Sequence, residues 1–131
     1  MIIGNIFLAD SINNQQNGIS AANPNLVYTA LSYPAFLSFD AALTICGIEQ
    51  LDGLMKLSVD LYDDNENFMS TLVEGEQQLP DFNSSERMTL NIILNLRKVV
   101  INTAGLYTLV VKVNSQEITR TKFEAWIANG K

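Results

Sequence analysis

The stretch Thr103–Asn114, T-A-G-L-Y-T-L-V-V-K-V-N, decides the fold of this chain. Gly105 and Tyr107 open a run rich in β-branched residues, and Asn114 closes it as a turn residue. From Tyr107 onward every second residue is apolar, so these side chains would share one face of a strand. The stretch therefore predicts a β-strand with one face in a core.

The same two-residue alternation recurs on both sides of this strand. The clear cases are Ala35–Cys46, Leu54–Asp63, Met88–Val99 and a last strand around Phe123–Ile127, and weaker candidates are Ile2–Leu8, Ile19–Thr29 and Phe68–Glu74. The connection Gly47–Gly53 contains an Asp-Gly turn and predicts that the strands on either side of it form a hairpin-like pair. Two polar stretches read as connections: Asn13–Asn25 as a loop or loose hairpin, and Glu74–Glu86 as a surface crossing between sheets.

These elements predict one all-β domain over residues 1–131, an antiparallel sandwich of seven to eight strands. The opening Gly105-Leu106-Tyr107 resembles the penultimate strand of immunoglobulin-like sandwiches, in which such a Tyr bonds back onto the preceding loop. We therefore expect Tyr107 to be buried, with its hydroxyl bonded to backbone before Gly105. The inward positions of the strands predict one shared core: Leu37, Phe39, Leu57, Val59, Leu94, Leu109, Val111 and Phe123.

Composition excludes several classes of function. The chain has a net charge of −6 and no His, which argues against nucleic-acid binding and removes imidazole catalysis and His-ligated metals. No apolar run approaches the roughly 20 residues that span a bilayer. The single Cys46 allows no internal disulfide, and Met1–Ala9 lacks the basic residue and cleavage site of a secretion signal. We expect a cytoplasmic protein without cofactor, membrane or nucleic-acid partner.

One stretch matches the ligand spacing of a calcium loop, with Asp63, Asn65, Asn67 and Glu74 at the ligand positions. The sixth position, where the loop requires the freedom of Gly, is Phe68, and strands rather than helices flank the stretch. We therefore interpret it as a hairpin tip in which Asp and Asn supply turn conformations, and we expect no metal.

Two further groups have side chains that can carry chemistry. Asp40 and Asp60 fall on the polar faces of two strands that we predict to be neighbours, so they could approach one another as a glycosidase-like pair. Outward carboxylates on a sheet are usually only solvated, and we predict no catalytic residue. Cys46 has no cation next to it in sequence, which indicates a half-buried, inert thiol.

The outward positions of the last strands are unusually apolar. Trp126 alternates with the inward Ala125 and Ile127, and with Tyr28, Tyr33 or Tyr62 it would form an aromatic platform unless the N-terminal strand or a long loop covers it. An interaction surface is predicted on the outer face of the sheet that carries the final strands, most simply for a homodimer: Trp126, Leu106, Val110 and Ile93.

The chain resembles a family of small, uncharacterised bacterial and phage-associated β-sandwich domains. The resemblance lies in an opening strand that ends Phe7-Leu8-Ala9-Asp10, in the Pro before an apolar strand at Tyr33–Phe39, and in Gly105-Leu106-Tyr107. It implies a fold, but no activity and no functional residues. Antibody-type sandwiches differ in carrying a Cys pair that this chain lacks.

Three functions remain open at this point. The first is a non-catalytic interaction or structural module of a bacterium or phage. The second is an acidic phage-encoded inhibitor of a host nucleic-acid-handling protein, whose binding would weaken steeply with salt. The third is a carbohydrate-binding domain, which requires Trp126 to be exposed beside another aromatic ring.

Overall fold

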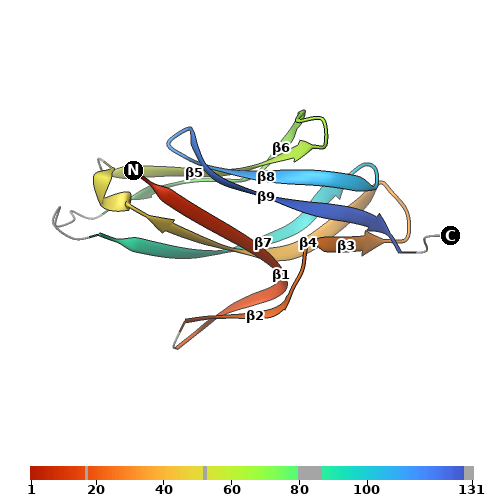
Figure 1. Ribbon diagram of the computed structural model, residues 1–131, viewed down its shortest axis with the longest axis horizontal. Coiled ribbons are helices and arrows are strands. Elements are labelled where there is room, and N and C mark those ends of the chain that lie inside the picture. The colour runs from red at the N-terminus through yellow and green to blue at the C-terminus, as the bar shows by residue number, and fades with distance from the viewer. Residues whose placement is uncertain (17, 52, 80–86, 129–131) are drawn as a thin grey trace.

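The computed structural model describes residues 1–16, 18–51, 53–79 and 87–128, which form nine strands in two layers (Figure 1). Only a short 3-10 turn, η1 (Ile48–Gln50), interrupts the strands in this part of the chain. The strands are β1 (Ile3–Gln15), β2 (Gly18–Pro24), β3 (Val27–Ala30), β4 (Ala35–Cys46), β5 (Leu54–Asp63), β6 (Phe68–Gln78), β7 (Thr89–Ile101), β8 (Gly105–Val113) and β9 (Gln116–Ile127).

The two sheets have the orders β2-β1-β4-β7 and β3-β9-β8-β5-β6. Every pair is antiparallel except β3 with β9, which run parallel, so the purely antiparallel sandwich of seven to eight strands is corrected on both points. β3 could not be recognised as a separate strand in the sequence, because a strand of four residues is too short to show a clear alternation of apolar and polar side chains. The amide of Asn25 donates to the carbonyl of Leu8, and its side-chain oxygen accepts from the amide of Val27, which redirects the chain from β2 to the second sheet.

The predicted hairpin between Ala35–Cys46 and Leu54–Asp63 is wrong. β4 pairs with β1 and β7, whereas β5 pairs with β6 and β8 in the other sheet. The connection is too long for a tight turn, and its Ile48 is buried in the core, so η1 carries the chain from one layer to the other. Glu49 then accepts a 2.9 Å hydrogen bond from the amide of Met88 and fixes the turn against the start of β7.

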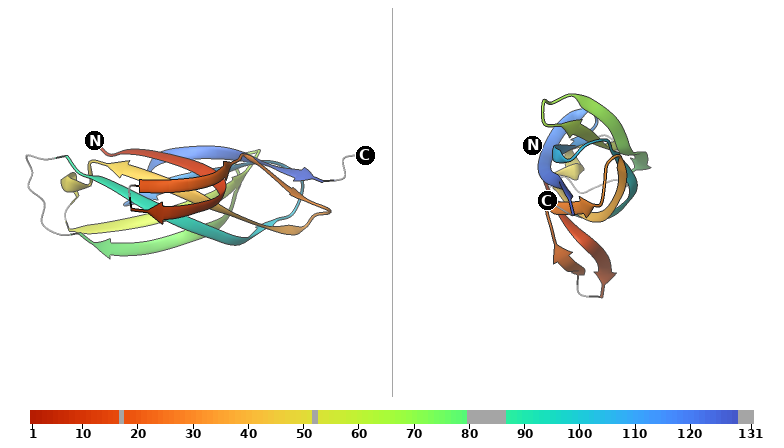
Figure 2. Two further views of the ribbon diagram at one scale, coloured as in Figure 1. Left: turned by 90° about the horizontal axis from the view of Figure 1, so that it is seen from below. Right: turned by 90° about the vertical axis from the view of Figure 1, so that its right-hand side faces the viewer.

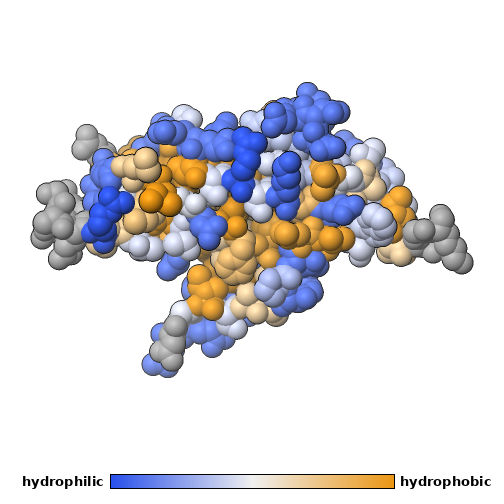
Figure 3. Space-filling model, viewed as in Figure 1, coloured by the Kyte–Doolittle hydropathy of each residue, from blue (hydrophilic) through white to orange (hydrophobic). Residues whose placement is uncertain are grey.

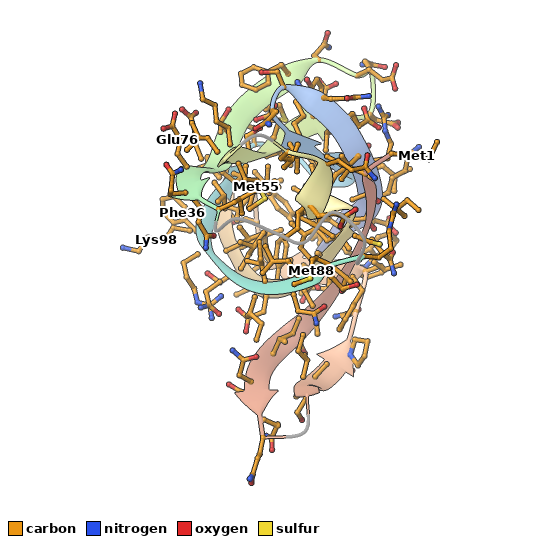
Figure 4. The ribbon with its side chains drawn as sticks, turned by 90° about the vertical axis from the view of Figure 1, so that its left-hand side faces the viewer. Met1, Phe36, Met55, Glu76, Met88 and Lys98 are labelled. Atoms are coloured by element: carbon orange, nitrogen blue, oxygen red, sulfur yellow. The ribbon has the colours of Figure 1, made fainter. Side chains whose placement is uncertain are left out.

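All eight predicted core residues are buried in one cluster, so the expected register of faces is confirmed. At its centre the ring of Phe39 in β4 stacks on Tyr28 at 4.5 Å and meets Phe123 at 5.3 Å between ring centroids. These contacts join the two sheets. Figure 4 shows Met55 pointing into the same interior, while Phe36 and Lys98 lie on the outside.

Tyr107 forms the predicted corner. It is buried, and its hydroxyl donates a 2.7 Å hydrogen bond to the carbonyl of Thr103. Its ring stacks on Phe123 with 5.8 Å between centroids, so the corner is also part of the core.

The polar stretch Asn13–Asn25 belongs to a two-stranded hairpin of β1 and β2 that stands away from the body of the sandwich (Figure 2). Its inner side covers Ala42 and Ile93 on the outer face of the four-stranded sheet. Glu74–Glu86 was predicted as a connection, but β6 continues to Gln78, and the rest, residues 80–86, lies outside the described residues. The crossing between sheets from β6 to β7 is confirmed.

Truncating either of two core residues tests this packing. Phe39→Ala and Leu109→Ala should each lower the free energy of unfolding by about 2–5 kcal/mol, because each leaves a cavity in a fully buried site. Urea denaturation measures this, with the exposed Val100→Ala as control, for which a change within about 0.5 kcal/mol is expected. A loss below about 1 kcal/mol at both core sites would contradict the packing.

The corner is tested by Tyr107→Phe, which should cost about 1–2 kcal/mol because it deletes the donor to the carbonyl of Thr103. Thr103→Ala is the matched control, since that carbonyl remains, and it should cost less. Thermal melting followed by circular dichroism compares the three proteins. An unchanged melting curve for Tyr107→Phe would show that the hydroxyl does not stabilise the corner.

Candidate functional site

Exposed apolar side chains gather at one end of the sandwich, where β4 and β8 begin and β3, β7 and β9 end. We call this surface the apolar end and define it by seven exposed residues: Val27, Leu31, Phe36, Val100, Leu106, Trp126 and Ile127. Figure 3 shows part of it as hydrophobic surface over β9 and β3, toward the end from which the C-terminus leaves. Single exposed apolar residues are ordinary, but seven at one end form a patch of the kind that marks an interaction site.

Strand register places these residues in two groups. Trp126 lies opposite Thr29 of β3, and Leu106 of β8 and Val27 of β3 lie opposite Glu124 of β9 on either side. On the other sheet Phe36 pairs directly with Val100. The apolar end therefore consists of two groups at the same end of the sandwich, one on the outer face of each sheet.

Charge is nearly absent from the segments that carry the apolar end. Residues 26–37 and 99–111 contain no Asp, Glu, Lys or Arg, and residues 123–128 contain only Glu124. The charged turn after β5 rises to one side of the patch (Figure 1). A partner that docks here would bury mainly apolar area and displace few ions.

Trp126 is the largest side chain of the patch and is 49% exposed. The hydroxyl of Tyr33 donates a 2.9 Å hydrogen bond to its carbonyl and ties the β3–β4 connection to β9. Partial burial raises the pKa of Tyr33, and the nearby Tyr107 makes a smaller contribution in the same direction. The phenol therefore stays protonated and can donate. The backbone that carries the indole is thus held in place by this hydrogen bond.

The four residues predicted as an interaction surface do not share one face. Leu106, Val110 and Trp126 belong to the five-stranded sheet, but Ile93 lies on β7 of the other sheet, half-buried under the β1–β2 hairpin. The expectation that one sheet is apolar on both faces is therefore wrong. Alternation along a strand identifies a face but not the sheet to which the face belongs.

Val110 is only 3% exposed although it points outward. It lies opposite Arg120 on β9 and Asp60 on β5, in a hollow that Lys112 also lines. Arg120 is held by two hydrogen bonds to the carboxylate of Glu117, at 2.8 and 2.7 Å. Long charged side chains with apolar stems thus cover Val110 and make the middle of this face polar.

The aromatic platform forms only in part. Tyr28 is a core residue stacked on Phe39, and Tyr62 pairs edge-on with Phe68 on a different part of the sheet. Tyr33 lies beside Trp126 through its hydroxyl contact, but in the described part of the chain the indole forms no ring pair. Trp126 is exposed as a single aromatic side chain.

Asp40 and Asp60 do not approach one another, because they lie on the outer faces of different sheets. Asp40 accepts a 2.8 Å hydrogen bond from the amide of Ile12 and lies 2.8 Å from Nη1 of Arg97. Asp60 accepts from the hydroxyl of Thr71 at 2.8 Å and lies 3.4 Å from Nζ of Lys112. Both carboxylates are engaged within the fold, and the predicted pair is corrected.

Cys46 is half-buried, as expected, but a cation does contact it. Nη2 of Arg87 lies 3.6 Å from its Sγ, although 41 residues separate the two in sequence. Sequence adjacency could not have shown this contact.

Of the calcium-loop residues, Asp63, Asn65 and Asn67 lie together in one turn, whereas Glu74 does not join them. Oδ1 of Asp63 accepts 2.9 Å hydrogen bonds from the amides of Asn65 and Asn67, which closes the turn after β5. Glu74 lies further along β6, opposite Ser58. Among the described residues, no group of three or more acidic or Cys side chains converges to hold a metal ion.

Five residues of the apolar end are not identified from sequence: Val27, Leu31, Phe36, Val100 and Ile127. Ile127 was expected to face inward, but it is exposed at the end of β9. The lack of charge over residues 26–37 and 99–111 could have indicated the other four, but only the topology shows that these segments meet. In the part of the chain that the structure describes, no helix is long and apolar enough to cross a membrane.

The chain belongs to a family of unknown function (DUF6941), whose model matches residues 5–125. This confirms the expectation of an uncharacterised family. Among curated proteins, none matches the chain.

Solved structures share the fold at low identity. A β-glucosidase from Listeria innocua is similar with a TM-score of 0.51 and 14% identity over 95% of this chain, and the same values hold for its complex with isofagomine. The chain spans only 16% of the length of that enzyme, so the likeness concerns a fold and not an activity. An alkylpurine DNA glycosylase from Pseudomonas fluorescens bound to DNA gives a TM-score of 0.41 at 12% identity, over 92% of this chain and 30% of its own, which carries no argument.

The turn after β5 gives a prediction on pH. The amide of Asn67 and other hydrogen-bond donors of the turn lower the pKa of Asp63. Its charge-dependent contribution to stability is therefore complete above the unfolded pKa of about 3.9 and is lost as the pH falls through the lower folded value. We expect wild type to be more stable than Asp63→Asn near neutral pH and the difference to vanish in acid.

Urea denaturation of both proteins across this acidic range measures the difference, and melting with Ca²⁺ or chelator is the control. A stability difference that does not depend on pH would contradict the role of the charge. A melting temperature raised by Ca²⁺ in wild type alone would show that Asp63 binds metal instead.

Proposed function

We propose that this protein is a non-catalytic β-sandwich interaction module that docks through its apolar end onto an apolar surface of a protein partner. The observation that carries the proposal is the group of seven exposed apolar residues around one end, with Trp126 among them and only Glu124 as a charge in the adjoining segments. A large, partly exposed aromatic side chain with other apolar side chains nearby is typical of the residues that dominate binding energy at protein interfaces.

The rigidity of the site supports the same proposal. The residues of the apolar end lie on strands or on the short β3–β4 connection, which the bond from Tyr33 to the carbonyl of Trp126 holds in place. A preformed patch loses little conformational entropy on binding. We also propose that the sandwich is of the immunoglobulin-like kind, which the hydrogen bond from Tyr107 to Thr103 supports.

The two alternative functions predict different behaviour. An acidic inhibitor would bind through charge, and its complexes would dissociate as salt is raised. A carbohydrate-binding domain would use paired aromatic rings, and Trp126 forms no ring pair within the described residues. Contact through the apolar end should instead resist salt.

Affinity capture from extract of the source cells tests the proposal with three immobilised baits: wild type, Trp126→Ser and Ile3→Ser. Ile3 is 55% exposed at the opposite end of the sandwich, which makes it the matched control. A partner of the apolar end should be retained by wild type and Ile3→Ser in about 1 M salt and lost from Trp126→Ser. Acrylamide quenching of the single Trp in the purified complex then shows whether the partner covers it.

Two results would contradict the proposal. The first is that every retained protein elutes with moderate salt, which would favour the acidic inhibitor. The second is that Trp126→Ser retains the same proteins as wild type and that the indole stays equally accessible to acrylamide in the complex.

A further inference from the structure

In the described part of the chain, β7 is an outermost strand of the four-stranded sheet. It has 13 residues and, among the described strands, pairs only with β4. From Thr89 to Leu96 its register with β4 is regular, from Thr89 opposite Cys46 to Leu96 opposite Phe39. The backbone N–H and C=O groups on the other side of β7 therefore form an unbroken template for a further strand.

This edge lacks the usual protection against pairing. Sheet edges are normally blunted by charges, prolines, bulges or shortness. Residues 89–96, T-L-N-I-I-L-N-L, contain no charge, no Pro and no Gly, and five of the eight residues are Ile or Leu. Such a segment left open would be an aggregation hazard, which indicates that a specific strand covers it.

The segment is nearly a palindrome about Ile93. Reading outward, Ile92 is matched by Leu94, Asn91 by Asn95, and Leu90 by Leu96. Antiparallel pairing of two identical strands about a two-fold axis sets each residue opposite its mirror position. An axis at Ile93 would thus place apolar residues opposite apolar residues and amides opposite amides.

We propose that two copies of this chain pair antiparallel through β7, with the two-fold axis at Ile93, and form one continuous eight-stranded sheet. On the inner face the half-buried Leu90 and Ile92 would lie against Leu96 and Leu94 of the partner subunit and lose their remaining exposure. This surface is separate from the apolar end, so the two proposals can be tested independently.

The outer face gives the pair its specificity. The hydroxyl of Thr44 donates a 2.8 Å hydrogen bond to Oδ1 of Asn91 and orients the amide. The NH₂ group of Asn91 is then directed away from that contact and can donate to Asn95 of the partner subunit, which lies directly opposite. Cross-strand amide pairs of this kind stabilise a sheet and fix its register.

The segment of β7 that can pair with a second copy ends after Leu96. The register of β7 with β4 breaks after Leu96, and Lys98 has a φ of 55°, so the strand kinks there. Arg97 at the kink is held by the carboxylate of Asp40. A register shifted toward the C-terminus would bring the kink and the two cations into the interface, and one shifted toward the N-terminus would pair fewer residues of β7.

Introducing like charges on both sides of the axis tests the proposal. Asn91 and Asn95 are both exposed, so an Asn91→Asp/Asn95→Asp variant should fold, yet it would set two pairs of carboxylates opposite one another. Sedimentation velocity should show a dimer for wild type and dimerisation weakened at least about tenfold for this variant. Gln77→Glu/Gln78→Glu, with the same charge change on the free edge of the other sheet, should dimerise as wild type does.

A rescue experiment excludes simple misfolding. The variant Asn91→Lys/Asn95→Lys should also be monomeric alone, and mixing it with the Asp variant should restore a dimer that contains one copy of each. In a Cys46→Ser background, Asn91→Cys mixed with Asn95→Cys should form a disulfide-linked pair, which fixes the register. A wild type that stays monomeric at about 100 μM, an Asp variant that dimerises like wild type, or a mixture that stays monomeric would overturn the proposal.

Discussion

The contact of Phe39 with Tyr28 and Phe123 is the interaction on which the rest of the structure depends. Phe39 comes from the four-stranded sheet, while Tyr28 and Phe123 come from β3 and β9 of the other, so these rings hold the two layers together. Burial raises the pKa of Tyr28, and its neutral hydroxyl donates a 2.8 Å hydrogen bond to the carbonyl of Asn25. The four-residue β3 could not stand alone as an edge strand, and this anchor holds it beside β9. The apolar end depends on the same anchor, because it places Val27 and the β3–β4 connection next to Trp126.

A second constraint acts on the outer face of the four-stranded sheet. The carboxylate of Asp40 is buried between the amide of Ile12, where β1 leaves β4, and the guanidinium of Arg97, at the kink of β7. Nη1 of Arg97 also donates to the carbonyls of Phe39 and Leu96. A buried charge is tolerated only when it is paired, so this group couples the position of the β1–β2 hairpin to the end of the regularly paired part of β7. The kink divides β7 into an uncharged edge and the segment with Val100 that joins the apolar end.

Much of the fold could be predicted because alternation reports which face of a strand is buried, and the positions of Phe39 and Leu109 followed from it. The partner of each strand could not be predicted in this way. Ala35–Cys46 and Leu54–Asp63 have equally clear patterns, yet they belong to different sheets, because the buried Ile48 makes their connection a crossing and not a turn. Ile93 was grouped with Trp126 because alternation does not show to which sheet a strand belongs. The burial of Val110 depends on the stems of Arg120 and Lys112, and no period in the sequence of β8 contains that information.

The two proposed surfaces have a geometric relation. β7 ends at the apolar end, since Ile101 pairs with Ala35 beside the Phe36 and Val100 contact. In an antiparallel pair the two copies of β7 run in opposite directions, so their C-terminal ends lie at opposite extremes of the joined sheet. A dimer built through β7 would therefore carry its two apolar ends far apart and directed away from each other, and neither would be covered by the pairing. Such a particle would be bivalent, and a partner with repeated apolar sites would bind it more tightly than either end alone, provided that the spacing of the sites matches the length of the dimer.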